Sequence, residues 1–445
     1  MQSLVVVLTY MAAAGEFTSL ATKGKHAMRC RWCVSVFSIL FLLAATTASA
    51  ADVIVRSERL PETMPWDLKQ LSEVPAFEWV DQKSSVRSLF YAGEPYGGKA
   101  TRVFAYYASP ATLTDGKAPN EKFPAVVLIH GGGGTAFREW AELWAKRGYA
   151  AIAMDLAGHR PNEGQNAHQP ANRTRLSDGG PNQGDDEKFG SVDKPPAEQW
   201  SYHAVAAAIR AHSLIRSFPE VDAQRTGVTG ISWGGYLTCI VSGLDNRFKA
   251  AVPVYGCGFL QDNSAWLSRF EKMSPEQRQR WVKLWDPSKY LPAVSMPILF
   301  VNGTNDFAYP LDSYMKSFDA VPGTKQLRVS VNLPHGHPPG WAPTEIGLFI
   351  DHQLGRGPAL PKLADPKTEN GRVQVAVKSE TKLKHAALHY TTDGDAINKR
   401  TWKTTAATID GNTITVEAAP AEATVWFITV TDERDALVSS RIVIR

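Results

Sequence analysis

The sequence predicts an α/β fold, a mostly parallel sheet with helices on both faces, followed by a β-sandwich. Between residues 123 and 357, short apolar runs alternate with amphipathic stretches, which is typical of parallel strands joined by crossover helices. After residue 357 a Pro-containing stretch, LPKLADP, leads into short runs of alternating polarity separated by turn residues, a pattern that indicates antiparallel strands. A chain of 445 residues is long enough for several domains.

The N-terminal residues 1–50 are predicted to be a signal peptide, with an upstream extension over residues 1–27. From Met28, two arginines precede an apolar run and an Ala-Ser-Ala ending at Ala50, the pattern of a cleaved secretory signal. A membrane anchor is the alternative, but the apolar run is shorter than the ~20 residues that a spanning helix needs. We therefore expect a secreted or periplasmic protein with no membrane association after cleavage.

The charge balance and the cysteine positions limit which partners, disulfides and metal sites the sequence predicts. The sequence has 48 Lys and Arg and 44 Asp and Glu; removing residues 1–50 leaves 44 and 43, so the mature chain is nearly neutral. This balance argues against nucleic acid as a partner, because phosphate binding needs a clustered basic surface. Export permits a disulfide between Cys239 and Cys257, and two buried free thiols are the alternative. Neither cysteine has metal-ligand spacing, so no metal and no cofactor is predicted.

The predicted elements follow in order. Residues 51–122 form an N-terminal segment that adds edge strands, including a hairpin over 85–110 with its turn at 94–100. Within the α/β domain, 123–357, the helix after the first strand places Phe137, Trp140, Leu143 and Trp144 on one face. The strands are at 125–130, 150–156, 225–231, 249–256, 297–303 and 327–333, and the helices are at 137–149, 201–217, 236–244, 264–285 and 344–355. Residues 358–445 form the β-sandwich, of the Ig-like kind, with strands at 372–380, 385–392, 413–418, 423–433 and 439–445.

Residues 157–198 interrupt this alternation with a segment rich in Gly, Asn, Asp, Gln and Pro and without apolar periodicity. A segment this long inside a compact domain is either functional or disordered. It leaves the carboxyl end of a central strand, where ligands bind in open α/β sheets. We interpret it as a wall or lid of the pocket, with disorder as the competing view.

The stretch TGVTGISWGGY places Ser232 between Gly230 and Gly234, with a strand before it and a helix after it. A serine on such a tight strand-to-helix turn is the pattern of a nucleophile elbow, which tolerates only very small neighbours. G-x-S-x-G alone also occurs in ordinary turns. The context of strand, helix and further site residues favours Ser232 as a nucleophile.

A glycine run, HGGGG at 130–134, follows the first parallel strand. Backbone N–H groups in such a run can approach a ligand closely, which suits an oxyanion hole. The predicted donors are Gly131, Gly132 and Gly133, together with the N–H of Trp233, the residue after the nucleophile. A purely structural turn would need fewer glycines.

The remaining catalytic candidates follow the last two strands of the α/β domain. Asp306, in VNGTNDFAYP, comes just past a buried strand and can orient and stabilise an imidazole; a turn aspartate is the alternative. His335 and His337, in NLPHGHPPGW, both lie where a triad histidine is needed. We favour His337 as the base because Gly336 precedes it, and His335 remains the competing candidate.

Together, HGGGG, GISWGGY, GTNDFAYP and PHGHPPGW resemble the secreted α/β-hydrolases of the acetylxylan esterase and dienelactone hydrolase group, which is related to prolyl-oligopeptidase-type serine hydrolases. The resemblance covers residues 120–357 and implies an α/β-hydrolase fold, a triad of Ser232, Asp306 and His337, and an ester or amide substrate. A β-propeller, typical of true oligopeptidases, does not precede this region in the sequence, and the C-terminal β-sandwich is an addition.

Three functions follow from these observations. The first is a serine carboxylesterase that deacetylates plant polysaccharide such as xylan through an acyl-enzyme. The second is a peptidase, which would need an anionic anchor for a substrate amine, and the run Asp185-Asp186-Glu187 is the candidate. The third is a non-catalytic carbohydrate-binding protein. The triad order Ser, Asp, His argues against the non-catalytic protein, and we favour the esterase, with a small-molecule or polysaccharide ester as its substrate.

Overall fold

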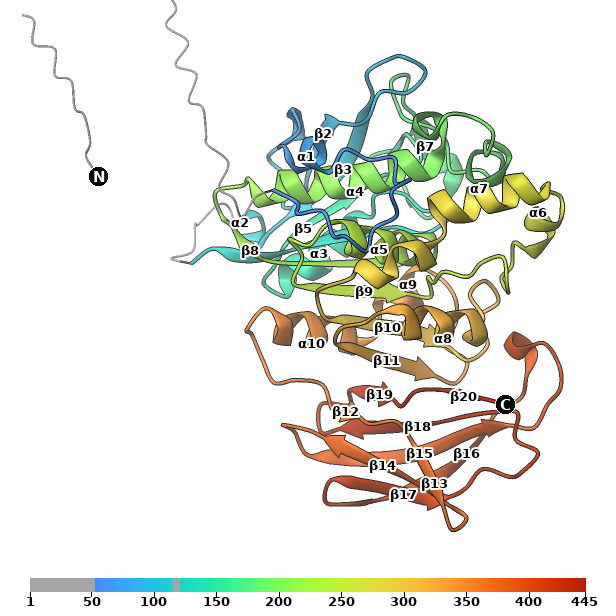
Figure 1. Cartoon of the computed structure of the whole chain (residues 1–445). Coiled ribbons are helices and arrows are strands. Elements are labelled where there is room, and N and C mark those ends of the chain that lie inside the picture. Colours follow the sequence, from blue (N-terminus) through green and yellow to red (C-terminus); the bar gives the residue numbers. More distant parts are fainter. Residues whose placement is uncertain (1–52, 115–120) are drawn as a thin grey trace, which may run out of the picture. The chain divides into compact units, whose positions relative to one another are not determined.

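The computed structural model describes residues 53–114 and 121–445 (Figure 1). The predicted signal peptide, residues 1–50, lies outside the described residues. Within these two ranges, no helix combines the length and apolar character needed to cross a membrane.

The central sheet has the order β1-β2-β3-β5-β4-β8-β9-β10-β11 (Figure 1). The first three strands are antiparallel and β3 pairs antiparallel with β5, whereas all pairs from β5 to β11 are parallel. The sheet is therefore mixed and mostly parallel, as the predicted fold class requires, and β1, β2 and β3 form its antiparallel edge. The strands are β1 (Phe77–Asp81), β2 (Arg87–Ala92), β3 (Arg102–Ala108), β4 (Phe123–Ile129), β5 (Ala150–Met154), β8 (Val221–Ile231), β9 (Ala250–Val254), β10 (Ile298–Gly303) and β11 (Lys325–Ser330).

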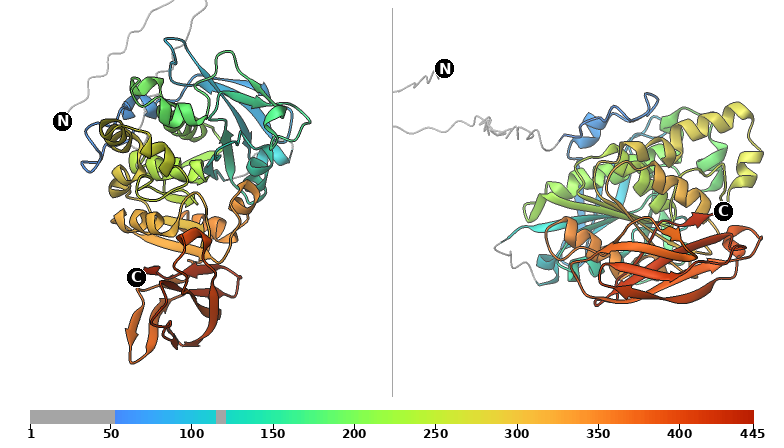
Figure 2. Two further views of the ribbon diagram at one scale, coloured as in Figure 1. Left: turned by 90° about the vertical axis from the view of Figure 1, so that its right-hand side faces the viewer. Right: turned by 60° about the horizontal axis from the view of Figure 1, so that its bottom comes forward.

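Helices cover both faces of this sheet (Figure 2). Two helices, α4 and α5, pack on each other and on the central strands, because their apolar residues recur around most of the helix surface. Two others, α3 and α10, are joined by an ion pair between Arg147 and Asp351. The helices are α1 (Leu68–Ser72), α2 (Pro110–Leu113), α3 (Arg138–Lys146), α4 (Trp200–Arg216), α5 (Trp233–Leu244), α8 (Leu311–Ala320), α9 (His337–Trp341) and α10 (Thr344–Gln353).

One side-chain prediction for α3 is wrong. Trp140 and Trp144 are buried as expected, but Leu143 is 43% exposed. Residues 140, 141, 144 and 145 form the buried face, and the 100° step of a helix turns position 143 toward its rim.

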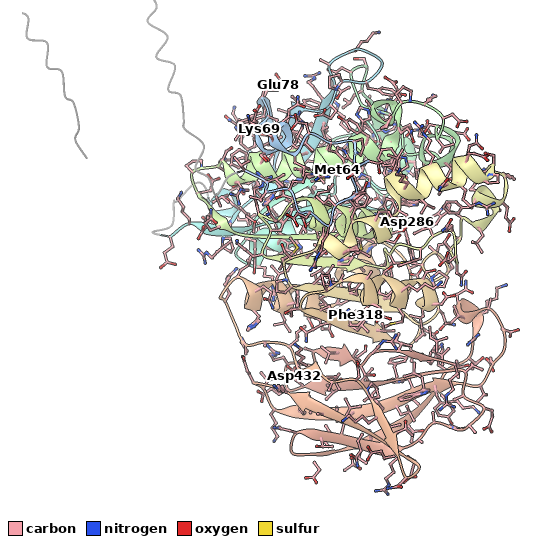
Figure 3. The ribbon with its side chains drawn as sticks, in the orientation of Figure 1. Met64, Lys69, Glu78, Asp286, Phe318 and Asp432 are labelled. Atoms are coloured by element: carbon pink, nitrogen blue, oxygen red, sulfur yellow. The ribbon has the colours of Figure 1, made fainter. Side chains whose placement is uncertain are left out.

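Two segments outside this regular alternation border the carboxyl ends of the strands. The segment 157–198 contains β6 (His159–Pro161), η2 (Pro170–Asn172), β7 (Arg173–Arg175), η3 (Asp186–Gly190) and η4 (Pro196–Glu198). The predicted helical insert at 264–285 divides into α6 (Leu267–Glu271) and α7 (Pro275–Trp285), followed by η5 (Pro287–Lys289) and η6 (Leu291–Ala293). Asp286, labelled in Figure 3, is fully buried after α7 and accepts N–H groups from Phe259, Leu260 and Ser288.

The C-terminal residues form antiparallel strands only. They pair in the order β13-β14-β17-β16-β15-β18-β19. Strand β16 pairs with β15 through residues 403–407 and with β17 through residues 408–410. The strands are β12 (Lys362–Leu363), β13 (Lys367–Glu369), β14 (Arg372–Lys378), β15 (Leu383–Thr391), β16 (Lys403–Asp410), β17 (Thr413–Glu417), β18 (Val425–Asp432), β19 (Leu437–Ser439) and β20 (Val443–Ile444), with η7 at Ile397–Lys399. The predicted sandwich and its boundary at residue 357 stay predictions.

The two parts of the chain share a sheet edge. β19 pairs antiparallel with β11, with Leu327 opposite Ser439. The hydroxyl of Ser439 also accepts the N–H of Val329 and donates to its carbonyl. The described residues, 53–114 and 121–445, accordingly form one compact unit.

We expect Gly234→Ala to destabilise the protein on the order of 3 kcal/mol, because overpacking is costly where backbone cannot yield. A Cβ at this position would overlap the carbonyl oxygens of Ile129 and His130. Gly394→Ala is the matched control, since a Cβ there meets nothing within 4 Å. Urea unfolding of both variants measures the difference, and a Gly234→Ala protein as stable as the control would contradict it.

Candidate active site

Ser232 lies at the turn between β8 and α5, as the sequence predicts. Its backbone has φ 59° and ψ −118°, a conformation that is costly for a residue with a side chain. Its N–H donates to the carbonyl of Val254 at 2.8 Å. Gly230 and Gly234 approach so closely that a Cβ on Gly230 would overlap the carbonyl of Gly234. The glycines therefore permit the sharp turn that presents the Ser232 hydroxyl.

His335 lies between Ser232 and Asp306. Its Nε2 is 2.9 Å from Ser232 Oγ, and its Nδ1 is 2.7 Å from Asp306 Oδ2. With Asp306 accepting from Nδ1–H, Nε2 carries the lone pair that can take the serine proton. The three side chains thus form a hydrogen-bonded line from hydroxyl to carboxylate, and its order is that of a serine-hydrolase triad.

The Asp306 carboxylate is fully enclosed and held on both oxygens. Its side chain has 0% exposure, and Oδ1 accepts the N–H groups of Ala308 at 2.9 Å and Tyr309 at 2.8 Å. Because these donors fix the carboxylate, Oδ2 keeps one direction toward His335. The turn that supplies them follows β10, so the strand end sets the position of the acid.

Aromatic rings enclose the imidazole of His335. The Tyr255 ring stacks on it at 4.4 Å between centroids, and the Tyr255 hydroxyl donates to the carbonyl of Pro334 at 2.7 Å. On another side, Phe307 lies 4.8 Å from the imidazole and is 59% exposed. Tyr255 thus fixes the histidine loop, while Phe307 offers an apolar surface to any molecule that approaches Ser232.

The preference for His337 as the base is wrong. His337 is the first residue of α9, and its Nε2 accepts the N–H of Gly131 at 2.9 Å. Its ring packs on Phe137 at 4.7 Å. Burial, reinforced by His130, lowers the pKa of His337 to about 3, so it is neutral and can accept this bond. Sequence alone could not separate the two histidines, because both follow the same strand and stand only two positions apart.

This bond also alters the predicted oxyanion hole. The N–H of Gly131 is engaged by His337, so one of the four predicted donors is already used. Trp233 is the first residue of α5, and N–H groups in the first turn of a helix have no intrahelical acceptor. Gly132 lies beside the Trp233 ring. Gly132, Gly133 and Trp233 stay predicted donors.

Residues of the 157–198 segment reach this site, and sequence reasoning did not identify them individually. Arg173 donates through Nη1 to the carbonyls of Gly133 at 2.7 Å and Gly134 at 2.8 Å. Lys188 lies 4.6 Å from the centre of the Trp233 ring, and burial lowers its pKa. The segment therefore walls the site. A basic residue in an aperiodic loop carries no local signal for such a role.

The chain after residue 357 contacts the loop that carries Asp306. Asn305, the residue before Asp306, donates through Nδ2 to the carbonyls of Asn398 at 3.2 Å and Arg400 at 2.8 Å. Asn305 Oδ1 accepts the Thr304 hydroxyl at 2.7 Å. The chain after residue 357 therefore helps to hold the loop that carries the acid.

The two cysteines of the α/β part are free thiols and fully buried. Burial raises the pKa of both Cys239 and Cys257. Of the two alternatives, the structure has buried thiols and not a disulfide.

Comparison with protein families identifies two matches. The family model of acetyl xylan esterase (AXE1) matches residues 67–290, which is half of the chain. The model of PhoPQ-activated pathogenicity-related protein matches residues 268–401.

Individual related proteins have low sequence identity to this chain. The uncharacterized peptidase YuxL of Bacillus subtilis is 30% identical over 218 residues, which cover 45% of this chain and 28% of that protein. The acetyl esterase Axe7A of Xylanibacter ruminicola is 22% identical over 200 residues, covering 42% of this chain and 44% of that protein. The chain therefore spans less than half the length of either relative. The structure of an acetyl xylan esterase from Paenibacillus sp. R4 has a TM-score of 0.49 and 23% identity, covering 62% of this chain and 88% of that one.

The two histidines should differ sharply on substitution. We expect His335→Ala to lose on the order of 10³-fold or more in kcat/KM on p-nitrophenyl acetate, because no base remains beside Ser232. His337→Ala should keep measurable turnover, since it loses the bond to Gly131 and the packing on Phe137 but leaves His335 beside Ser232. The reverse order would move the base to His337.

His337 should also contribute to acid lability. It stays neutral in the folded protein down to about pH 3, whereas in the unfolded chain it binds a proton near its ordinary value of 6.5. The unfolded state therefore binds more protons between these pH values, and stability falls as pH falls through this window. We expect the melting temperature of His337→Gln to fall less than that of the wild type between pH 7 and pH 4, by a few degrees. Equal declines in both proteins would contradict this contribution.

Proposed function

Because this chain belongs to the acetyl xylan esterase family, we propose that it is a serine carboxylesterase that removes acetyl groups from plant polysaccharide such as xylan. Membership supports hydrolase activity. The observation that carries the finer proposal is the line of hydrogen bonds Ser232–His335–Asp306, with 2.9 Å and 2.7 Å between the bonded atoms. We further propose that the chain is exported and cleaved after Ala50.

In the proposed reaction, Ser232 Oγ attacks the carbonyl carbon of the ester while His335 Nε2 takes the hydroxyl proton. Asp306 holds Nδ1–H and stabilises the imidazolium that forms. The negative charge on the former carbonyl oxygen is stabilised by backbone N–H groups, for which Gly132 and Trp233 are the candidates.

Collapse of this intermediate breaks the ester bond. His335 returns the proton to the departing sugar oxygen and the acetyl group remains on Ser232. Water then attacks the acetyl-serine with His335 again acting as the base, and acetate and free Ser232 result. Phe307, exposed beside the imidazole, is placed to contact the sugar or the acyl group.

A peptidase is the second candidate, supported by the 30% identical relative named as a peptidase. It would need an anion to hold a substrate amine. Asp185, in the candidate acidic run, is already paired with Arg269 at 2.7 Å and Lys188 at 3.5 Å. The pairing of Asp185 makes this member of the run a weaker anchor for an amine, which supports the ester substrate over the amine-bearing peptide.

A substrate panel separates the candidates. We expect the protein to hydrolyse p-nitrophenyl acetate and to release acetate from acetylated xylan, with kcat/KM on the nitrophenyl ester at least about 100-fold above that on aminoacyl-p-nitroanilides. Preference for the anilides would instead establish the peptidase, and inactivity on every substrate would favour the non-catalytic carbohydrate-binding protein.

Ser232→Ala should reduce ester turnover by a factor on the order of 10⁴. Ser177→Ala, at an exposed serine of the wall segment, is the control and should leave turnover unchanged. Circular dichroism shows whether both variants are folded. Near wild-type turnover in folded Ser232→Ala would show that Ser232 is not the nucleophile.

A further inference from the structure

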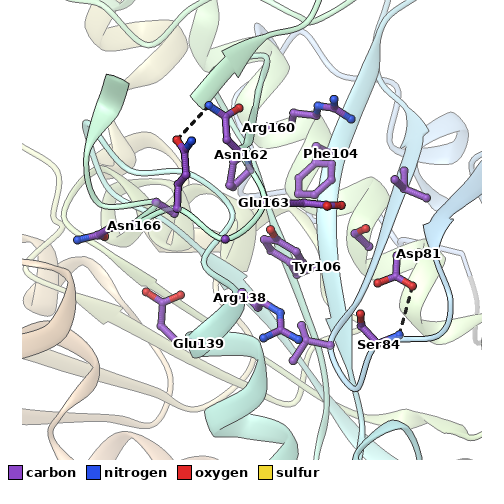
Figure 4. A pocket seen from close by; sticks show the side chains of 17 residues that line it. Asp81, Ser84, Phe104, Tyr106, Arg138, Glu139, Arg160, Asn162, Glu163 and Asn166 are labelled. Carbon is purple, nitrogen blue, oxygen red and sulfur yellow. Dashed lines mark hydrogen bonds between the residues drawn. The ribbon is translucent and has the colours of Figure 1, made fainter. Parts of the chain in front are cut away.

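We propose that a cavity of about 780 Å³ beside the candidate active site binds a segment of a neutral, hydroxyl-rich carbohydrate chain. The cavity lies between the edge strands β1–β3, the start of α3 and the loop between β6 and β7 (Figure 4). Its volume falls within the ~300–1,000 Å³ range of ligand sites. The proposal rests on the proposed esterase function and adds to it a place for the polymer.

The floor of the cavity is aromatic. Tyr106 and Phe104, both on β3, line it (Figure 4), and their rings meet edge to face at 5.0 Å. Phe90 holds Phe104 in a second edge-to-face contact at 5.6 Å. These contacts fix the rings before any ligand arrives, which lowers the entropy cost of binding. A sugar ring has an apolar face of C–H groups, and the half-buried Tyr106 ring, fixed by the buried Phe104, complements it.

The rim of the cavity is polar, and three of its charged side chains are unpaired within the described residues. Arg138, Arg160 and Glu163 line it, and their side chains form no hydrogen bond or ion pair with any residue in the described ranges. The side-chain amides of Asn162 and Gln165 lie on the loop between β6 and β7, joined by a hydrogen bond at 3.4 Å. Amides, carboxylates and guanidinium groups together supply donors and acceptors. Hydroxyl groups both donate and accept, so they match such a mixture.

The balance of charge favours a neutral chain. Three carboxylates line the cavity, Asp81, Glu139 and Glu163, against the two guanidinium groups of Arg138 and Arg160. The hydrogen bond from Ser84 lowers the pKa of Asp81, which keeps that group ionised at neutral pH. An acidic sugar would meet net negative charge.

A series of side-chain contacts links the cavity wall to the residues around Ser232. Glu139, on the cavity wall, accepts from His168 Nε2 at 2.7 Å, and the His168 ring stacks on Phe137 at 4.5 Å. Phe137 in turn packs on His337, which accepts the N–H of Gly131. The segment from Gly131 to Glu139 therefore has the candidate active site at one end and the cavity at the other. A chain seated in the cavity can present a neighbouring sugar to Ser232.

Binding is tested without turnover in the Ser232→Ala protein. Calorimetric titration with xylohexaose should give saturable binding that is at least about tenfold weaker when Tyr106→Ala is added, a loss of about 1.4 kcal/mol. Tyr96→Ala, a partly buried tyrosine that does not line the cavity, should leave binding unchanged. No binding, or equal loss in both tyrosine variants, would overturn the site. Tighter binding of a galacturonic acid hexamer than of xylohexaose would overturn its neutral character.

Activity provides a second test, in the protein with Ser232 intact. For Tyr106→Ala and Gln165→Ala we expect kcat/KM on acetylated xylo-oligosaccharides to fall about tenfold, chiefly through KM. Turnover of p-nitrophenyl acetate should change less than about twofold, because this ester is too small to reach the cavity. If the wild type cleaves p-nitrophenyl acetate and the variants keep full activity on the oligosaccharide, the cavity proposal fails alone. A wild type inactive on every ester defeats the proposed function instead.

Discussion

The close approach of backbone at the turn after β8 is the constraint on which the rest of the site depends. Gly234 lies against the carbonyls of Ile129 and His130, so α5 can begin directly above the neighbouring strand. The turn forces Ser232 to a positive φ, and its conformational cost is offset by the packing of a helix whose twelve residues are all buried. Because this turn is rigid, the Ser232 hydroxyl has a fixed position for the loops that carry His335 and Asp306.

Those two loops are held from outside the α/β part as well as from within it. Inside, Tyr255 stacks on the imidazole of His335 and bonds the preceding proline carbonyl. Outside, Asn305 donates to two carbonyls of the C-terminal part, and β19 pairs with β11. The antiparallel strands after residue 357 therefore contribute to the precision of the site although they place no side chain in the line from Ser232 to Asp306.

The sequence was sufficient for those features that depend on local pattern. Buried parallel strands appear as apolar runs, and the elbow appears as small residues at fixed spacing, so β4, β8 and the position of Ser232 were predictable. The choice between His335 and His337 was not, because it depends on the path of a short loop and on which imidazole faces Gly131. The Thr-rich strand β16 was missed because its outward positions are exposed and its apolar signal is weak. Arg173 and the cavity beneath the 157–198 segment depend on contacts between distant residues, and no periodicity records them.

The pairing of β11 with β19 has a consequence for biosynthesis. Leu327 and Ser439 are partners in the sheet, yet more than a hundred residues separate them in the chain. Because polypeptides emerge from the ribosome N-terminus first and early domains begin to fold at once, β11 is made long before the strand that covers it. During that interval the nascent chain presents an unpaired strand edge, which is the kind of surface through which proteins associate wrongly. Synthesis of residues 437–439 thus covers this edge, and a ribosome that stalls before them would leave the strand edge open to association with other chains.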